Sequence, residues 1–450
     1  MNSKVTVSGL AARLQNGECS AEEMLQDVLA RIADEAGQGG KVFTRVHAAT
    51  ALASAQASDT LRRAGMARSA IEGLPVSVKD LFDIAGETTL AGSVVLKERP
   101  AASADAEVVR RLRAAGAVIV GKTNMTEFAY SGLGINPHYG TPLNPWDRQL
   151  GRIPGGSSSG AAVSVADGMA IAGIGSDTGG SVRIPAALCG LAGFKPTARR
   201  VSTRGALPLS THLDSIGPIA PSVACCATLD SVLSGADPAQ LAPADLRGLR
   251  LVVPTTVVLN DMDAHVAQSF ARALNKLAAA GAGITEMAVP AFARLATINS
   301  KGGFTAAEAW AWHREIIATA ADRYDPRVVS RMLRGRDMGA ADFIDLLGAR
   351  QAWIAEVEAA TAGFDAMLMP TVPLVAPSVA ELQASEEEYF RVNGLMLRNT
   401  TFINFLDGCA LSIPCHDSGT APVGLTIAAP AMHDARVLSI GLAAEALFAA

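Results

Sequence analysis

The stretch DAEVVRRLRAAGAVIVG, residues 105–121, decides the fold class of this 450-residue chain. Its first part carries apolar residues at helical spacing and ends at Gly116, a residue type that commonly stops a helix. The apolar run AVIVG that follows has the length and β-branched content of a strand. A similar run, LPVSV (74–78), precedes the helix. A strand, a helix and a second strand in this order indicate an α/β protein.

The same alternation continues along the chain. Residues 1–70 are predicted to be helical, with a capping box at Ser20–Glu23 and an amphipathic run at 47–66. We expect one domain over 1–450, made of an N-terminal helical buttress (1–70), a core (71–220) and a remaining α/β region with the substrate pocket (221–450). Further strands are predicted at 249–254, 365–370 and 423–429, and helices at 264–281, 306–321, 340–361 and 434–448.

Composition excludes several classes of protein. A hydrophobic content of 49% with 18% charged residues is typical of a globular chain, and a net charge of -5 gives no footprint for nucleic acid. The six cysteines show no metal-binding spacing, which predicts a reducing, cytoplasmic location and no metal. No apolar run is long enough to span a membrane, and the first residues do not resemble a signal peptide.

A glycine-rich zone at 151–195 interrupts the regular pattern, and it contains IPGGSSSGAAVS (153–164). A flexible linker is a poor interpretation because apolar residues run through the zone. Gly156–Gly160 also fits the G-x-S-x-G pattern of a hydrolase elbow with Ser158 as nucleophile. That elbow requires a buried strand before the serine, and the preceding NPWDRQLGRIPG is too polar and proline-rich to form one.

A second stretch, GIGSDTGGSVRIPAALCG (173–190), offers a better nucleophile. Gly179 and Gly180 allow the backbone before Ser181 to turn several N–H groups toward one point, which is the outline of an oxyanion hole. The stretch completes neither a dinucleotide-binding G-x-G-x-x-G nor a phosphate loop, so no cofactor is predicted.

Lys79, at the end of the run LPVSV, is the candidate base for Ser181. Apolar surroundings disfavour an ammonium ion, and the lysine pKa must fall by about 3 units from about 10.4 to serve near neutral pH. Lys122 and Lys195 stand at similar strand ends and remain rivals, whereas none of the seven histidines lies in a segment that looks like a site.

Six motifs carry a resemblance to a known family. In order, they are PVSVKDLFD, GKTNMTEFAYSG, LNPWD, PGGSSSGAA, GSDTGGSVRIPAALCGLAGFKPT and LDSIGPIAPS. From about residue 71 to 220 the chain resembles the amidase signature family, and APVGLTIAAP near the end is similar to the closing strand of that family. The resemblance implies a central mixed, twisted sheet covered by helices on both faces.

The resemblance also implies roles for individual residues. Lys79 corresponds to the base, Ser157 to a bridging serine after a cis peptide bond, and Ser181 to the nucleophile that forms an acyl-enzyme. Ser159 stands where the family often has glycine, outside this catalytic set. Further implied site residues are Thr178, Gly179 and Gly180 in the oxyanion hole and Tyr130 and Ser131 in the acyl pocket.

The implied function is hydrolysis of a carboxamide C–N bond in a small-molecule substrate, without cofactor, nucleic acid or membrane, and a homodimer stays open. The alternatives are a glutaminase (A-type) subunit of an amidotransferase complex such as the tRNA-dependent one, and a non-catalytic scaffold. Arg183 either pairs with Asp177 or binds a substrate carboxylate. Residues 285–420 are expected to form much of the acyl pocket, with the Trp310–His313 segment as a hypothetical cap.

Overall fold

The computed structural model describes residues 5–236 and 241–449, and in them eleven strands form one sheet. The strand order is β1-β3-β2-β4-β6-β5-β10-β11-β9-β7-β8. The strands are β1 (Phe43–Val46), β2 (Pro75–Lys79), β3 (Val118–Thr123), β4 (Ala172–Asp177), β5 (Ala192–Lys195), β6 (Ser215–Ala220), β7 (Arg250–Pro254), β8 (Gly283–Met287), β9 (Ala366–Pro370), β10 (Cys409–Pro414) and β11 (Gly424–Ala429).

The sheet is mixed, as the resemblance implied. Strand β2 runs parallel to β3 and β4, and β7 runs parallel to β8 and β9, while the other neighbouring strands are antiparallel. Every strand predicted from an apolar run is present, with ends that differ by at most two residues. The parallel arrangement of β2 and β4 matters most for function, because it brings their carboxyl ends to the same edge of the sheet.

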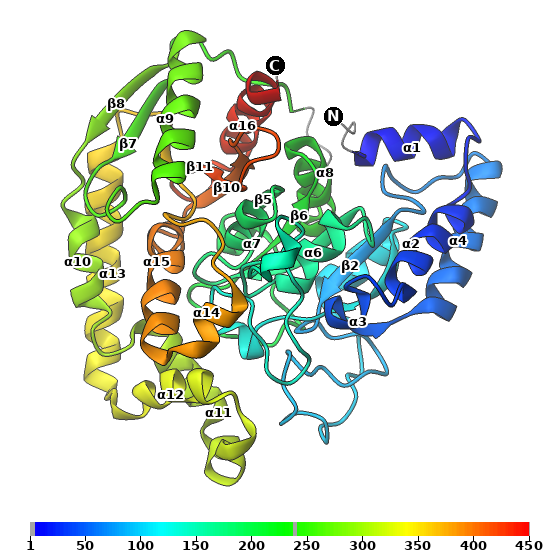
Figure 1. Ribbon diagram of the computed structural model, residues 1–450, viewed down its shortest axis with the longest axis horizontal. Coiled ribbons are helices and arrows are strands. Elements are labelled where there is room, and N and C mark those ends of the chain that lie inside the picture. Colours follow the sequence, from blue (N-terminus) through cyan, green and yellow to red (C-terminus); the bar gives the residue numbers. More distant parts are fainter. Residues whose placement is uncertain (1–4, 237–240, 450) are drawn as a thin grey trace.

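Helices surround this sheet along its whole length (Figure 1). Figure 1 shows α2 and α4 at one end of the molecule and α9, α10 and α13 at the other. The α-helices are α1 (Val7–Gln15), α2 (Ala21–Ala33), α3 (Gly39–Val42), α4 (Ala48–Arg63), α5 (Glu107–Ala114), α6 (Ser159–Ala166), α7 (Arg183–Leu188), α8 (Val223–Ser234), α9 (Ala264–Ala279), α10 (Ala291–Ile298), α11 (Gly303–Ala320), α12 (Pro326–Leu333), α13 (Ala340–Thr361), α14 (Val379–Ala384), α15 (Glu386–Phe405) and α16 (Asp434–Ala449).

Two close approaches show that helices cover both faces of the sheet. A Cβ on Gly424 of β11 would lie 2.6 Å from the side chain of Ala187 in α7. A Cβ on Gly441 of α16 would lie 2.1 Å from the side chain of Leu411 in β10. Leu411 pairs with Ile427, so these two side chains share one face of the sheet. Gly424 is three residues from Ile427 on the same strand, so a Cβ on Gly424 would point to the opposite face. Helices α7 and α16 therefore pack on different sides of the same strands.

Several elements were not predicted from the sequence. They are the strands β4, β5, β6, β8 and β10 and the helices α6, α8, α10, α12, α14 and α15. Of these, β4, β5 and α6 lie in the glycine-rich zone, where small side chains replace larger ones. The N-terminal region is also less uniformly helical than expected, because β1 pairs with β3 at the edge of the sheet. A strand whose residues are mostly small lacks the alternation of large apolar and polar side chains that the sequence argument uses.

In the parts of the chain that the structure describes, no helix is both long enough and apolar enough to cross a lipid bilayer.

The close packing of β5 and β6 gives a stability prediction. A Cβ on Gly217 of β6 would lie 1.9 Å from the carbonyl oxygen of Phe194, so Gly217→Ala should lower the free energy of unfolding by about 1–3 kcal/mol. Gly348 in α13 has no atom within 4 Å of the same position, and Gly348→Ala should raise it by up to about 1 kcal/mol. Urea unfolding of both variants measures the difference, and equal stabilities would contradict this packing.

Candidate active site

The candidate site lies at the shared carboxyl edge of β2 and β4. Lys79 is the last residue of β2, and Ser176 and Asp177 end β4. The turn after β4 carries Ser181 into α7, and the turn before α6 carries Ser157. Residues that are about a hundred positions apart in the sequence therefore meet at one point because their strands are parallel neighbours.

Lys79 is fully buried and surrounded by oxygen atoms that carry no formal charge. Its Nζ donates to Ser157 Oγ over 2.7 Å and to Ser176 Oγ over 2.9 Å. Burial lowers the pKa of Lys79 to about 7, although the negative charges of Asp177 and Asp214 oppose this shift. A substantial fraction of Lys79 is therefore a neutral amine near neutral pH, which a proton acceptor must be.

The two rival lysines are engaged elsewhere. Lys122 Nζ lies 3.3 Å from the carboxylate of Asp80, and both side chains are buried. Lys195 Nζ donates to the carbonyl oxygens of Pro196 and Gly408, each over 2.7 Å, and burial lowers its pKa to about 8. In the described residues, Lys79 is the one lysine of these three that contacts a serine of the glycine-rich zone.

Ser157 follows a tight backbone approach that only glycine permits. The Gly156–Ser157 peptide bond is cis, as the resemblance implied. A Cβ on Gly156 would lie 2.5 Å from the backbone nitrogen of Gly134, and the Gly156 N–H donates to Gly132 O over 2.8 Å. The next residue, Ser158, donates its N–H to the carbonyl oxygen of Ser181 over 3.3 Å. The serine run thus touches both the base and the backbone of the candidate nucleophile.

Ser181 lies in the wall of a cavity of about 230 Å³, together with Thr178 and Gly179. Gly180 gives the turn its shape, with φ of 132°, and a Cβ there would lie 2.2 Å from the hydroxyl of Thr400. Such a positive φ and so close a contact both exclude a larger residue. Thr400 Oγ1 also donates to the carbonyl oxygen of Gly179, which holds the turn from the side of α15.

The N–H groups of this turn differ in their availability. Gly180 N–H donates to Asp177 Oδ1 over 2.8 Å, so it is occupied, contrary to the role expected for Gly180 as an oxyanion donor. Within residues 5–236 and 241–449, the N–H groups of Gly179 and Ser181 have no hydrogen-bond acceptor. Two neighbouring free donors beside a hydroxyl in a cavity form an arrangement that can bind a developing negative charge.

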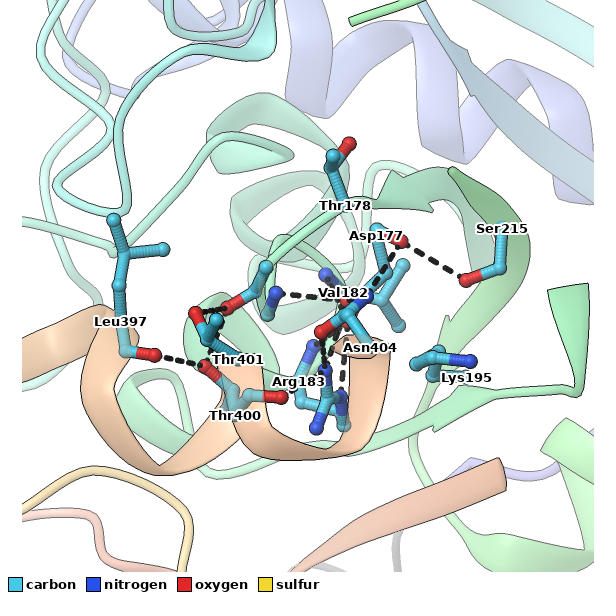
Figure 2. Close-up of polar contacts among 12 residues, drawn as sticks. Asp177, Thr178, Val182, Arg183, Lys195, Ser215, Leu397, Thr400, Thr401 and Asn404 are labelled. Carbon is cyan, nitrogen blue, oxygen red and sulfur yellow. Dashed lines mark hydrogen bonds and ion pairs between the residues drawn. The ribbon is translucent and has the colours of Figure 1, made fainter. Parts of the chain in front are cut away.

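Asp177 and Arg183 form a buried ion pair behind the turn (Figure 2). Arg183 donates to both carboxylate oxygens of Asp177, over 3.0 and 2.9 Å, and to Asn404 Oδ1 over 2.6 Å. Burial alone raises the pKa of Asp177, but the charge of Arg183 outweighs it and holds the pKa well below its usual range. Arg183 does not line the cavity of Ser181, so of its two sequence interpretations the structural pair is the one observed.

Tyr130 and Ser131 both line the cavity of Ser181, but their polar groups already have partners. Ser131 Oγ donates to Asn393 Oδ1 over 2.8 Å and accepts from the hydroxyl of Tyr389 over 3.0 Å. The Tyr130 hydroxyl lies 3.3 Å from Thr305 Oγ1. Both residues therefore shape the wall of the cavity and connect it to the C-terminal half of the chain.

Most of the remaining cavity wall comes from residues between 299 and 405, within the region 285–420 expected to form much of the pocket, and Leu209 and Leu213 also contribute to it. The Trp310–His313 segment does not line the cavity. His313 is buried against Phe128 with ring centres 4.3 Å apart, and Trp312 lines a different cavity of about 410 Å³. Twelve further residues that line the cavity carry no recognisable motif in the sequence. These are Leu209, Leu213, Asn299, Gly302, Gly303, Phe304, Thr305, Arg331, Arg334, Leu397, Thr401 and Phe405.

The described part of the chain contains no group of three or more histidine, cysteine, aspartate or glutamate side chains that could hold a metal ion.

Comparison with known proteins places this site in context. A family model described as Amidase matches residues 23–438. The 2-amino-5-chloromuconic acid deaminase of Comamonas testosteroni is 35% identical, over 97% of this chain and 95% of that protein. The A subunit of glutamyl-tRNA(Gln) amidotransferase from Chloroflexus aggregans is 33% identical, over 97% and 95% of the two chains. A solved crystal structure of an amidase aligns with a TM-score of 0.88 at 31% identity, over 98% of this chain and 99% of that one.

The buried ion pair behind the turn gives a second stability prediction. Arg183→Met should lower the free energy of unfolding by about 3–5 kcal/mol, because it leaves the charge of Asp177 buried without its partner. Arg247→Met removes an exposed pair with Asp245 and should cost less than about 1 kcal/mol. Thermal unfolding of the two variants provides the measurement. An Arg183 variant with wild-type stability would contradict the structural role of the pair.

Proposed function

Because the chain belongs to the amidase family, it is a hydrolase that cleaves amide C–N bonds, and we propose that Ser181 is its nucleophile, activated by Lys79 through Ser157. The observation that carries this proposal is the 2.7 Å hydrogen bond between the buried Lys79 amine and Ser157 Oγ. Ser157 lies one residue from the backbone contact between Ser158 and Ser181. The order in space is therefore the base Lys79, then the Ser157 hydroxyl, which can transfer protons, and then Ser181 in the wall of the cavity.

The proposed reaction begins with neutral Lys79. The amine takes the proton of Ser157 Oγ while Ser157 takes the proton of Ser181, and the Ser181 oxygen attacks the amide carbonyl. In the part of the chain described, the hydroxyls of Ser157 and Ser181 share no direct hydrogen bond, as is common before substrate binds. The Ser181 hydroxyl must therefore turn toward Ser157 in the complex with substrate. The same path returns the proton to the leaving amine, and water then cleaves the acyl-enzyme.

We place the oxyanion of the tetrahedral intermediate at the free N–H groups of Gly179 and Ser181. In this arrangement Thr178 and Gly180 shape the turn, and Gly180 keeps its own N–H on Asp177. The donors are fixed before the reaction because the turn is held by the Asp177–Arg183 pair on one side and by Thr400 on the other. Fixed donors stabilise developing charge without reorganisation, and loss of one typically costs about 10²–10³ in rate.

The charges in the cavity point to the substrate class. Arg331 and Arg334 line the cavity, whereas none of its lining residues is an aspartate or glutamate. In the described residues neither arginine forms an ion pair with a carboxylate. The first turn of α11 also lines the cavity, and the N–H groups of Phe304 and Thr305 have no acceptor in that part of the chain. Two guanidinium groups without a carboxylate partner and a helix N-terminus favour an anionic ligand.

We therefore propose that the preferred substrate is a small amide that also bears a carboxylate. Two relatives have names that point to a carboxylate-bearing substrate, although only the second of these substrates is itself an amide. One is the deaminase of 2-amino-5-chloromuconic acid, and the other is the AtzE subunit of 1-carboxybiuret hydrolase from a Pseudomonas strain, 33% identical over 95% of both chains. The cavity volume of about 230 Å³ suits a small molecule.

A second candidate function is that of a glutaminase subunit in a larger amidotransferase. It is favoured by the similarity to the A subunit of glutamyl-tRNA(Gln) amidotransferase, and glutamine also bears a carboxylate. This candidate requires glutamine to be the best substrate of the purified chain in a panel of amides, with turnover that rises when partner subunits are added. Rapid hydrolysis of another carboxylate-bearing amide by the chain alone favours the stand-alone amidase.

The serine run allows a matched test of the catalytic set. Ser181→Ala should reduce kcat by at least about 10⁴-fold, because no other group can form the acyl-enzyme. Ser159→Ala removes a hydroxyl that only donates to Asn124 O over 3.4 Å, and its activity should stay within about tenfold of the wild type. Acyl-enzyme trapping followed by mass spectrometry provides the measurement. If the Ser181→Ala variant still formed the acyl adduct and another serine variant did not, the nucleophile would be that other serine.

The substrate class is tested at the exposed arginine. Arg334→Met should raise KM for succinamate by about tenfold, while hydrolysis of the neutral analogue butanamide stays unchanged, since only the former needs the charge. The control is Arg336→Met, which changes an exposed arginine outside the cavity that pairs with Asp337. An equal effect of Arg334→Met on both amides would contradict carboxylate recognition.

A further inference from the structure

Asp214 joins two segments that the proposed mechanism needs but does not connect. It lies directly before β6, and its carboxylate accepts three hydrogen bonds. Thr178 Oγ1 donates to Oδ1 over 2.5 Å. The N–H groups of Leu209 and Ser210 donate to Oδ2 over 3.0 and 3.1 Å. One carboxylate therefore binds the turn after β4 to the loop before β6.

Both segments form walls of the cavity that contains Ser181. Thr178 and Gly179 line it from the turn, and Leu209 and Leu213 line it from the loop. Asp214 itself lines another cavity, of about 490 Å³, together with His212 and Arg350. The Thr178–Asp214 bond thus crosses from one cavity wall to the other, and a change at Asp214 reaches the oxyanion turn through a single side chain.

The charges around Asp214 set it apart from Asp177. Asp177 is neutralised by Arg183, whereas Asp214 forms no ion pair within the described residues. The charged groups near Asp214 have partners of their own. His212 pairs with Glu308, Arg350 donates to the carbonyl oxygens of His212 and Phe405, and Arg199 pairs with Asp407.

The negative charge of Asp214 also acts on the base. Asp177 and Asp214 are the two carboxylates whose charges favour the protonated form of Lys79. Burial raises the pKa of Asp214 to about 6, with a further contribution from Glu308, so Asp214 is ionised at pH 7 and above. In the pH range in which Lys79 loses its proton, Asp214 therefore carries a negative charge that opposes this loss.

We propose that Asp214 is a positioning residue of the amidase reaction, one that holds the Thr178 turn against the Leu209–Leu213 loop. Asp214 directly precedes Ser215, which pairs with Asp177 at the carboxyl end of β4, so its negative charge, which has no ion-pair partner in the described residues, lies at the edge of the sheet that also carries Lys79. The role rests on the proposed function, because it assumes that Lys79 is the base. It has two separable parts: a clamp made by hydrogen bonds and a field made by charge.

Asp214→Asn tests the charge while keeping the clamp. The asparagine carbonyl can accept from the N–H groups of Leu209 and Ser210, and its amide can donate to Thr178 Oγ1. The acidic limb of the kcat/KM profile should lie near pH 7 in the wild type, since Lys79 must be neutral. In the variant it should move to lower pH by about half a unit or more, because the charge that favours protonated Lys79 is gone. The control is Asp407→Asn, which changes another carboxylate that lines the same cavity of about 490 Å³ as Asp214 and should leave the acidic limb at its wild-type pH.

Thr178→Val tests the clamp while keeping the charge. It should lower kcat by about tenfold, because the turn loses its hydrogen bond to a charged group, without moving the limb of the pH profile. A wild-type profile without a limb near pH 7 would overturn the Lys79 relay itself. If the limb is present in the wild type and stays at the same pH in Asp214→Asn, the effect of the Asp214 charge is refuted. If Thr178→Val keeps the full kcat, the role of the hydrogen-bonded clamp is refuted. Neither result would affect the Lys79 relay. Thermal unfolding of each variant ensures that folded enzyme is compared.

Discussion

A primary amine held away from water, with uncharged oxygen atoms as its hydrogen-bond partners, is the constraint on which this site depends. Burial disfavours the charged form of Lys79, and within the described residues Lys79 forms no ion pair, whereas Lys122 lies 3.3 Å from the carboxylate of Asp80. Three features preserve this state: the end of a central strand, the tight glycine turn before Ser157, and the parallel pairing that brings Ser176 alongside. The same lysine with a carboxylate partner would be a structural cation.

The positions of the serines follow from that constraint. Ser157 must contact the amine of Lys79, while the backbone of the next residue, Ser158, must still reach the turn that carries Ser181. That turn is fixed from behind by Asp177, whose charge is matched by a fully buried arginine. Electrostatic balance is thus divided between two carboxylates. Asp177 is paired with Arg183, whereas Asp214 is hydrogen-bonded to Thr178 and forms no ion pair within the described residues.

The sequence predicted several strands with large apolar side chains, and the resemblance implied the residues of the proposed catalytic set. The glycine-rich strands were not predicted. These strands need glycine because helices approach their backbone. A Cβ on Gly173 would lie 2.7 Å from Ala161 O in α6, and one on Gly193 would lie 2.6 Å from Ala186 in α7. The packing that creates the strand also removes its hydrophobic pattern. The occupied N–H of Gly180 and the place of Arg331 in the cavity likewise depend on tertiary contacts, which no local pattern encodes.

The two halves of the cavity have different origins in the chain. The groups assigned to bond cleavage lie between residues 79 and 181, whereas much of the opposing wall comes from 299–334 and 397–405. A substitution in the second half can therefore change ligand preference without altering the groups assigned to bond cleavage. Proteins related to this chain can thus acquire new small-molecule substrates while they keep the same bond-cleaving groups.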